Sequence, residues 1–163
     1  LALLPGALGY AFMAIMSGRL YDRYGAKLPI MIGLSLMMIG TLCMAILPLS
    51  VGNMTLSFMI VQLGAGFWFG NNMTHAVSHV AVAHQNAGNS IFSATNNYSA
   101  AVGIALAAGV LAIFQNQAVD SKAAFVAATR AGTVWMFRLD ILLIVIAGSL
   151  SLWALRVVKQ RAL

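Results

Sequence analysis

The chain has 163 residues, of which 61% are hydrophobic and 7% are charged, and its formal net charge is +6. Water-soluble domains are usually about a quarter charged, so this composition excludes a soluble surface and indicates an integral membrane protein with the lipid bilayer as its partner. The basic residues flank apolar runs and form no continuous patch interleaved with aromatic residues, so we expect no nucleic-acid partner.

The apolar runs are long enough to cross a bilayer, which takes about 20 residues. Because the hydrocarbon core offers no water, a spanning backbone must form helices or a closed barrel. The run 28–47 lacks the alternation of a barrel strand. The predicted fold class is therefore all-α, a polytopic helical membrane protein whose single transmembrane domain, residues 1–163, has about five transmembrane helices.

The first predicted span, 1–17, is slightly short for a bilayer and starts at Leu1 with no initiator Met or signal peptide, so we expect a fragment. A basic hairpin over 18–27 follows. The second span, 28–47, has Pro29 in its first turn, where the missing N–H costs nothing, and Pro48 just past its end.

The third and fourth predicted spans, 56–78 and 91–114, are polar toward the loop between them. Residues 115–133 are too polar to span and predict a short surface helix. The fifth span is 134–155. Lys and Arg are more numerous in the 18–27 hairpin and the C-terminal tail than on the opposite face, so both are predicted to be cytoplasmic.

The 18–27 hairpin is a candidate functional loop because it concentrates charge between two apolar spans. Its glycines suit a tight turn, and its basic residues suit an anionic membrane surface. An ordinary positive-inside loop explains the same residues.

The stretch Gly18-Arg-Leu20-Tyr-Asp22-Arg23-Tyr-Gly25-Ala-Lys27 resembles the signature loop of the major facilitator superfamily, Gly-x-Leu-x-Asp-Arg-x-Gly-x-Lys. The stretches 3–7, 64–70 and 88–105 are similar to the C-terminal half of drug:proton antiporters with 14 spans. The resemblance implies that an N-terminal half of the same chain is missing here. It also implies a conformational latch, which stabilises one of two alternating-access states, at Gly18, Asp22, Arg23, Gly25 and Lys27.

A second group of candidates consists of polar side chains inside the third and fourth spans. Polar residues within a membrane are costly, so they face other helices or a wet cavity. The predicted substrate cavity is lined by Asn71, Asn72, His75, Asn96, Asn97 and Tyr98. Hydrogen bonds between helices explain the same residues.

Two further features concern ions. His75 and His79 are four residues apart, a spacing that suits a metal, but no acid lies nearby, so we expect no metal and no cofactor. Asp140, the one acid within a span, is a possible proton site; an interfacial charge is the alternative.

These features predict a non-enzymatic secondary transporter in the plasma membrane, most consistent with proton-coupled efflux of drugs or other amphipathic small molecules by alternating access. A carrier for a metabolite or sugar is an alternative within the same class. Other classes left open are a non-transporting membrane scaffold or sensor, and a membrane metalloenzyme using His75 and His79.

Overall fold

The computed structural model describes residues 4–116 and 121–161, with side chains to Val157. The described residues form helices and no strand, in agreement with the predicted fold class. The elements are α1 (Leu4–Tyr24), α2 (Lys27–Ile46), α3 (Val51–Ser78), the short 3-10 helix η1 (Val82–His84), α4 (Gln85–Asn116) and α5 (Lys122–Arg161). The start of the first predicted span, Asp120, and the side chains of Lys159 and Arg161 lie outside the described part.

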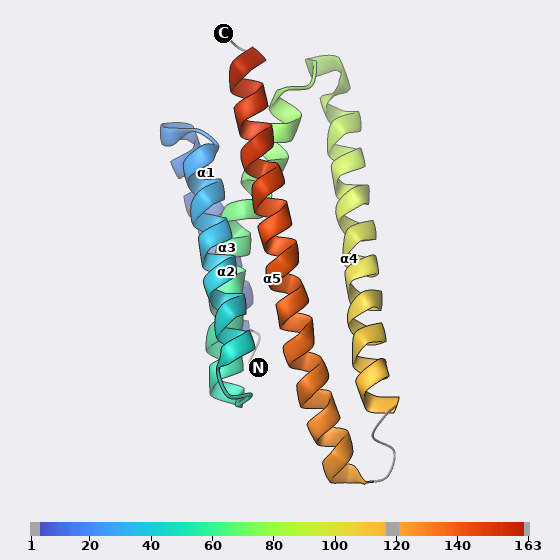
Figure 1. Ribbon diagram of the computed structural model, residues 1–163. Helices are drawn as coiled ribbons and strands as arrows, with labels where there is room; N and C mark the ends of the chain where they lie inside the picture. Colours follow the sequence, from blue (N-terminus) through green and yellow to red (C-terminus); the bar gives the residue numbers. More distant parts are fainter. Residues whose placement is uncertain (1–3, 117–120, 162–163) are drawn as a thin grey trace.

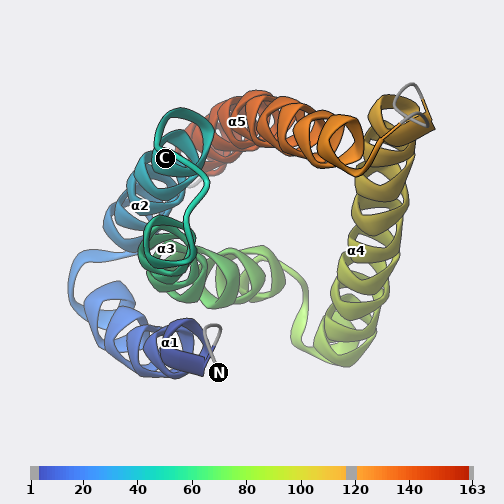
Figure 2. The same cartoon turned by 90° about the horizontal axis from the view of Figure 1, so that it is seen from below.

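The helices run up and down beside one another, so that the turn between α1 and α2 lies at the same end of the molecule as the C-terminus (Figure 1). The opposite end holds the connection between α2 and α3. Viewed from below, α1, α2 and α3 form a close group, α5 packs on α2, and α4 lies beyond α5 (Figure 2).

The packing is that of a membrane protein. Buried side chains are few and mostly small or hydroxylated, including Ser17, Thr41 and Ser57, whereas large apolar side chains cover the outside. Lipid tails are as apolar as leucine, so large side chains gain little by turning inward, and small residues let helices approach closely. Three helices, α2, α4 (with η1) and α5, are long and apolar enough to cross a bilayer on length and composition alone.

Glycine contacts hold α2 against α3. A Cβ atom on Gly64 would lie 2.6 Å from the carbonyl oxygen of Gly33 and 2.7 Å from the backbone nitrogen of Met37. A Cβ on Gly33 would meet the backbone of α3 equally closely. Two backbones this near each other leave no room for a side chain at either position.

A buried hydroxyl group joins α1 to α3. Ser17, only 2% exposed, lies with its Oγ 2.9 Å from the carbonyl oxygen of Ala14 and 3.3 Å from that of Gly66. A Cβ on Gly66 would lie 2.6 Å from the carbonyl oxygen of Tyr10. α1 and α3 therefore approach closely at Gly66, whereas a Cβ on Gly70 would meet no described atom within 4 Å beyond the backbone of its own helix.

The basic hairpin is mostly helix. α1 continues to Tyr24, seven residues beyond the expected end of the first span, and the chain reverses over Gly25 and Ala26. Gly25 has φ 75°, and its N–H donates to the carbonyl of Tyr21 at 2.7 Å, the left-handed cap that ends many helices. The motif is therefore the last turns of α1, a two-residue turn and the first residue of α2.

The helices α3, α4 and α5 also begin before the expected starts of their apolar spans. α3 begins at Val51 after Ser50, whose Oγ accepts the N–H of Asn53 at 3.3 Å, and α4 begins at Gln85. The separate surface helix expected within 115–133 does not form in the described residues, because α5 runs without a break from Lys122. Its start is capped by Ser121, whose Oγ accepts the N–H of Ala124 at 3.1 Å.

Candidate functional site

The polar half of α3 is held by bonds within the helix. Asn71, 3% exposed, donates from Nδ2 to the carbonyl of Phe67 at 2.6 Å, and Asn72 donates in the same way to Trp68 at 3.0 Å. Each amide therefore uses one donor on its own helix. Its remaining polar atoms are available to a neighbouring helix, to water or to a ligand.

Two ring nitrogens on α3 have no partner. Trp68 Nε1 and His75 Nε2 are buried and make no hydrogen bond with any residue that the structure describes. These residues are seven apart, two helical turns, so they lie on one face of α3. A buried polar atom without a partner costs about 1–3 kcal/mol, so this face is poised to receive a hydrogen bond. The sequence analysis missed Trp68; its spacing of two turns from His75 was the available signal.

The polar face of α3 lies toward the end of the molecule that holds the α1–α2 turn. Gly33 packs against Trp68, which fixes the register of α2 on α3. His75 is about 10 Å further along α3, and Lys27, the first residue of α2, is about 9 Å from Gly33 in the same direction. His75 is thus about level with the start of α2.

Asn96, Asn97 and Tyr98 occupy a different level on α4, and all three are exposed. Phe69 and Phe92 set the register between α3 and α4, because their ring centroids are 5.7 Å apart with the rings edge to face. From that contact, Asn71 lies toward one end of the molecule on α3 and Asn96 lies toward the other end on α4. Asn71 and Asn96 are therefore offset by about 9 Å along the helix axes, and His75 and Asn96 by about 15 Å. The structure groups the three predicted residues of α3 but does not bring them together with the three of α4.

The two histidines of α3 contact each other, with ring centroids 4.6 Å apart. His79 Nδ1 lies 2.7 Å from the carbonyl oxygen of His75, and since a carbonyl only accepts, His79 carries its proton on Nδ1. The ring of His79 therefore caps its own helix. No group of three His, Cys, Asp or Glu side chains able to hold a metal occurs in the described residues.

Asp140 lies at the edge of a cavity of about 690 Å³ between α2, α3 and α5. The cavity is mainly apolar, with Met44, Phe58 and Phe137 among its lining residues. The neighbouring Arg138 turns to Trp135, with its guanidinium carbon 5.2 Å from the ring centroid. Asp140 thus faces a cavity at the end of the bundle opposite the α1–α2 turn.

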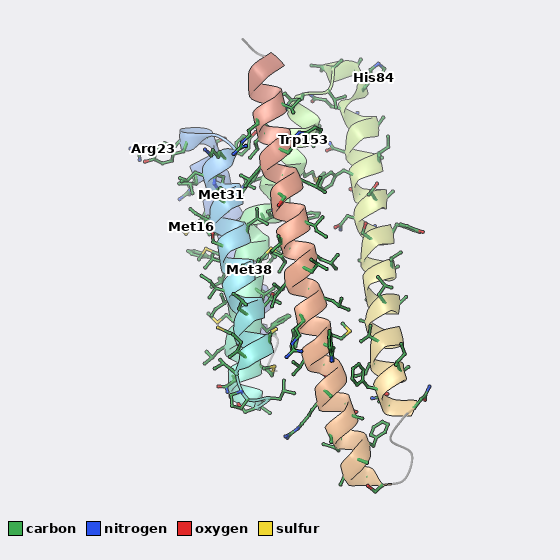
Figure 3. All side chains as sticks on the ribbon, in the orientation of Figure 1. Met16, Arg23, Met31, Met38, His84 and Trp153 are labelled. Atoms are coloured by element: carbon green, nitrogen blue, oxygen red, sulfur yellow. The ribbon has the colours of Figure 1, made fainter. Side chains whose placement is uncertain are left out.

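The residues of the predicted latch surround that turn. Gly18 lies within α1, where a Cβ would meet no described atom within 4 Å beyond the backbone of its own helix. Asp22 and Arg23 are exposed in the last turns of α1, and Lys27 starts α2. Arg23 points outward from the end of α1 (Figure 3), and its guanidinium carbon is 5.3 Å from the centroid of the Tyr24 ring. The side chains of Asp22, Arg23 and Lys27 are all exposed.

Fold and packing together define a helical membrane protein whose polar residues gather on the inner helix α3. The chain matches the family model of the Major Facilitator Superfamily over residues 1–162, and it belongs to that family of membrane transporters. No curated protein and no solved structure matches the chain.

Proposed function

We propose that this protein is a proton-coupled exporter of amphipathic small molecules that works by alternating access at the plasma membrane. Family membership supports a secondary transporter. The further step to efflux is favoured by the resemblance of the 18–27, 64–70 and 88–105 stretches to drug:proton antiporters. The same resemblance predicts that an N-terminal half of the carrier provides the other wall of the substrate path.

The observation that carries the proposal is the pair of unpartnered ring nitrogens on α3. Trp68 Nε1 and His75 Nε2 lie on the face that also presents Asn72, in a helix whose neighbours α1 and α2 cover its other sides. A hydrogen bond from a substrate to this face would remove the cost of leaving these nitrogens without a partner. Asn96, Asn97 and Tyr98 complete the cavity in a state where α4 approaches α3.

We assign the proton to Asp140. A carboxyl group beside an apolar cavity is stable when it is protonated and costly when it is ionised alone, so its state is sensitive to an approaching charge. The turn between α1 and α2 is assigned to the cytoplasmic side because it carries Arg19, Arg23 and Lys27. There the exposed Asp22 and Arg23 act as the latch of one transport state.

The experiment is transport into inverted membrane vesicles prepared from cells that express the full-length protein. Acidifying the vesicle interior should drive accumulation of amphipathic dyes, and a protonophore should abolish it. Asp140→Asn should lose this proton dependence, whereas Asp22→Asn should slow uptake under every condition. Accumulation of sugars or hydrophilic metabolites in place of the dyes would contradict the efflux assignment and favour a metabolite carrier.

A further inference from the structure

Two phenylalanine rings join α3 to α4, and the proposed function does not use them. The ring centroids of Phe69 and Phe92 are 5.7 Å apart, and the rings meet edge to face at 62°. Both side chains are half-buried, whereas every α4 residue from 93 to 106 is exposed. The packing of this part of α4 on α3 therefore stops at Phe92.

The two rings lie between two levels of polar side chains. Asn72 is three residues from Phe69 and Asn96 is four residues from Phe92, so each amide shares a helix face with its phenylalanine. Because α3 and α4 run in opposite directions, Asn72 lies toward the α1–α2 turn and Asn96 lies toward the other end (Figure 1). The two amides are about 10 Å apart along the helix axes, with the aromatic pair between them.

The helix α4 is held to its neighbours near its two ends. Just before the polar stretch, Gln85 donates from Nε2 to the carbonyl of Val80 at 3.3 Å. At the far end, Gln115 donates from Nε2 to Oγ1 of Thr129 on α5 at 3.1 Å. Figure 2 shows α4 beginning near the end of α3 and ending beside the start of α5. The aromatic rings can therefore part by rotation of a ring or by a small tilt of α4, without sliding of the helix.

We propose that Phe69 and Phe92 form a gate in the substrate path, closed in this structure between the polar level at Asn72 and the polar level at Asn96. An apolar constriction closes a polar path because water leaves it, and a polar group crosses only when the side chains part. An aromatic pair shifts an equilibrium by about twofold to tenfold, which is small enough for the gate to open in every transport cycle. The gate rests on the proposed function, which supplies the path that it closes.

The test is labelling of Asn96→Cys by a membrane-impermeant maleimide in the full-length protein, in a background without other cysteines. The reagent is added on the side from which Lys27→Cys reacts, which is the side of the α1–α2 turn. Adding Phe92→Ala should raise the labelling rate of Asn96→Cys about tenfold, the upper end of the effect of an aromatic pair. The matched control is Ile104→Ala, which removes an apolar side chain that is 71% exposed on the same helix. Equal labelling rates with Phe92→Ala and with Ile104→Ala would overturn the gate.

A general loosening of the fold by Phe92→Ala is recognised at Ser57, which is 2% exposed on α3. Labelling of Ser57→Cys should stay slow when Phe92→Ala is added. Faster labelling at Ser57→Cys as well as at Asn96→Cys would mean that the aromatic pair only stabilises the fold, and would overturn the gate.

A crosslink tests closure directly. Phe69→Cys and Phe92→Cys, joined by a short bismethanethiosulfonate, should stop the uptake of ethidium into inverted vesicles, and reduction of the crosslink should restore it. Uptake at the full rate with the crosslink in place would overturn the gate. Failure of the uncrosslinked protein to take up ethidium would count against efflux alone, because the labelling of Asn96→Cys decides the gate without a substrate.

Discussion

Gly18 and Gly25 lie seven residues apart in the 18–27 motif, but their backbone conformations differ. Gly25 has φ 75°, a conformation that costs other residues about 1–2 kcal/mol, whereas Gly18 is helical with open space around it. Gly25→Ala should therefore lower the apparent free energy of unfolding by about 1 kcal/mol, measured by thermal unfolding of the full-length protein in detergent. Gly18→Ala should be neutral or slightly stabilising, since alanine favours helix.

The same pair separates stability from function. If Gly18 takes part in the latch, Gly18→Ala should slow transport although the protein stays folded. Full transport by Gly18→Ala would restrict the latch to the other residues of the motif. A clear loss of stability would contradict the open environment found around Gly18.

His75 allows a test of the polar face of α3. Its Nε2 is buried without a partner, whereas the ring of His79 is exposed and caps the helix end. We expect His75→Ala to reduce transport at least tenfold while the amount of protein in the membrane stays unchanged. His79→Ala, the matched control, should keep most of the activity. Equal activity of the two variants would argue against a substrate or proton contact at His75.

At the scale of elements, the contact between α2 and α3 depends on paired glycines. A Cβ on Gly64 would lie within 2.8 Å of atoms of both Gly33 and Met37, so Gly64→Ala forces the two backbones apart. Overpacking of this kind costs about 1–3 kcal/mol, and we expect a lower midpoint of thermal unfolding. Gly70→Ala on the same helix has nothing within 4 Å and should leave the midpoint unchanged or raise it. A midpoint lowered equally by both variants would contradict the role of the contact between Gly33 and Gly64.

The sequence predicted the helical membrane class, but the ends of its apolar runs did not mark the ends of the helices. Hydropathy falls at Ser17 because charged residues follow, yet arginine and leucine favour helix, so α1 continues through the charged residues until Gly25 ends it. Alanine-rich sequence extends α5 back to Lys122 in the same way, whereas α3 starts at Val51 because Ser50 caps it. A fall in hydropathy reports where lipid ends, and only a cap reports where a helix ends.

The candidate site was predictable in its residue types and less so in its arrangement. Spacing alone places Asn71, Asn72 and His75 together on α3, because helical periodicity is regular. The offset of Asn96 from these residues depends on the register between α3 and α4, which the Phe69–Phe92 contact fixes. Such a tertiary contact leaves no periodic signal in the sequence. The burial of the Trp68 N–H without a partner among the described residues is likewise a tertiary property, although the spacing of Trp68 from His75 was visible in the sequence.

At the scale of the whole molecule, Asp22 tests the latch. It is exposed at the end of α1, so Asp22→Asn removes a charge without disturbing the packing of α1 on α3. We expect transport by the full-length protein to fall several-fold, with normal insertion and stability, measured by dye uptake into vesicles. Lys122→Gln changes an exposed charge at the opposite end and is the control. Unaltered uptake with Asp22→Asn would remove the latch assignment.

The central claim is that the helices cross a membrane with the α1–α2 turn on the cytoplasmic side. Its most direct measurement is labelling of single cysteines by a membrane-impermeant maleimide, in a background where Cys43 is replaced by alanine. Lys27→Cys lies at the α1–α2 turn, and Ser50→Cys lies at the opposite end, before α3. We predict that Lys27→Cys reacts only in inverted vesicles and Ser50→Cys only in intact cells; reaction of Lys27→Cys in intact cells would contradict the account.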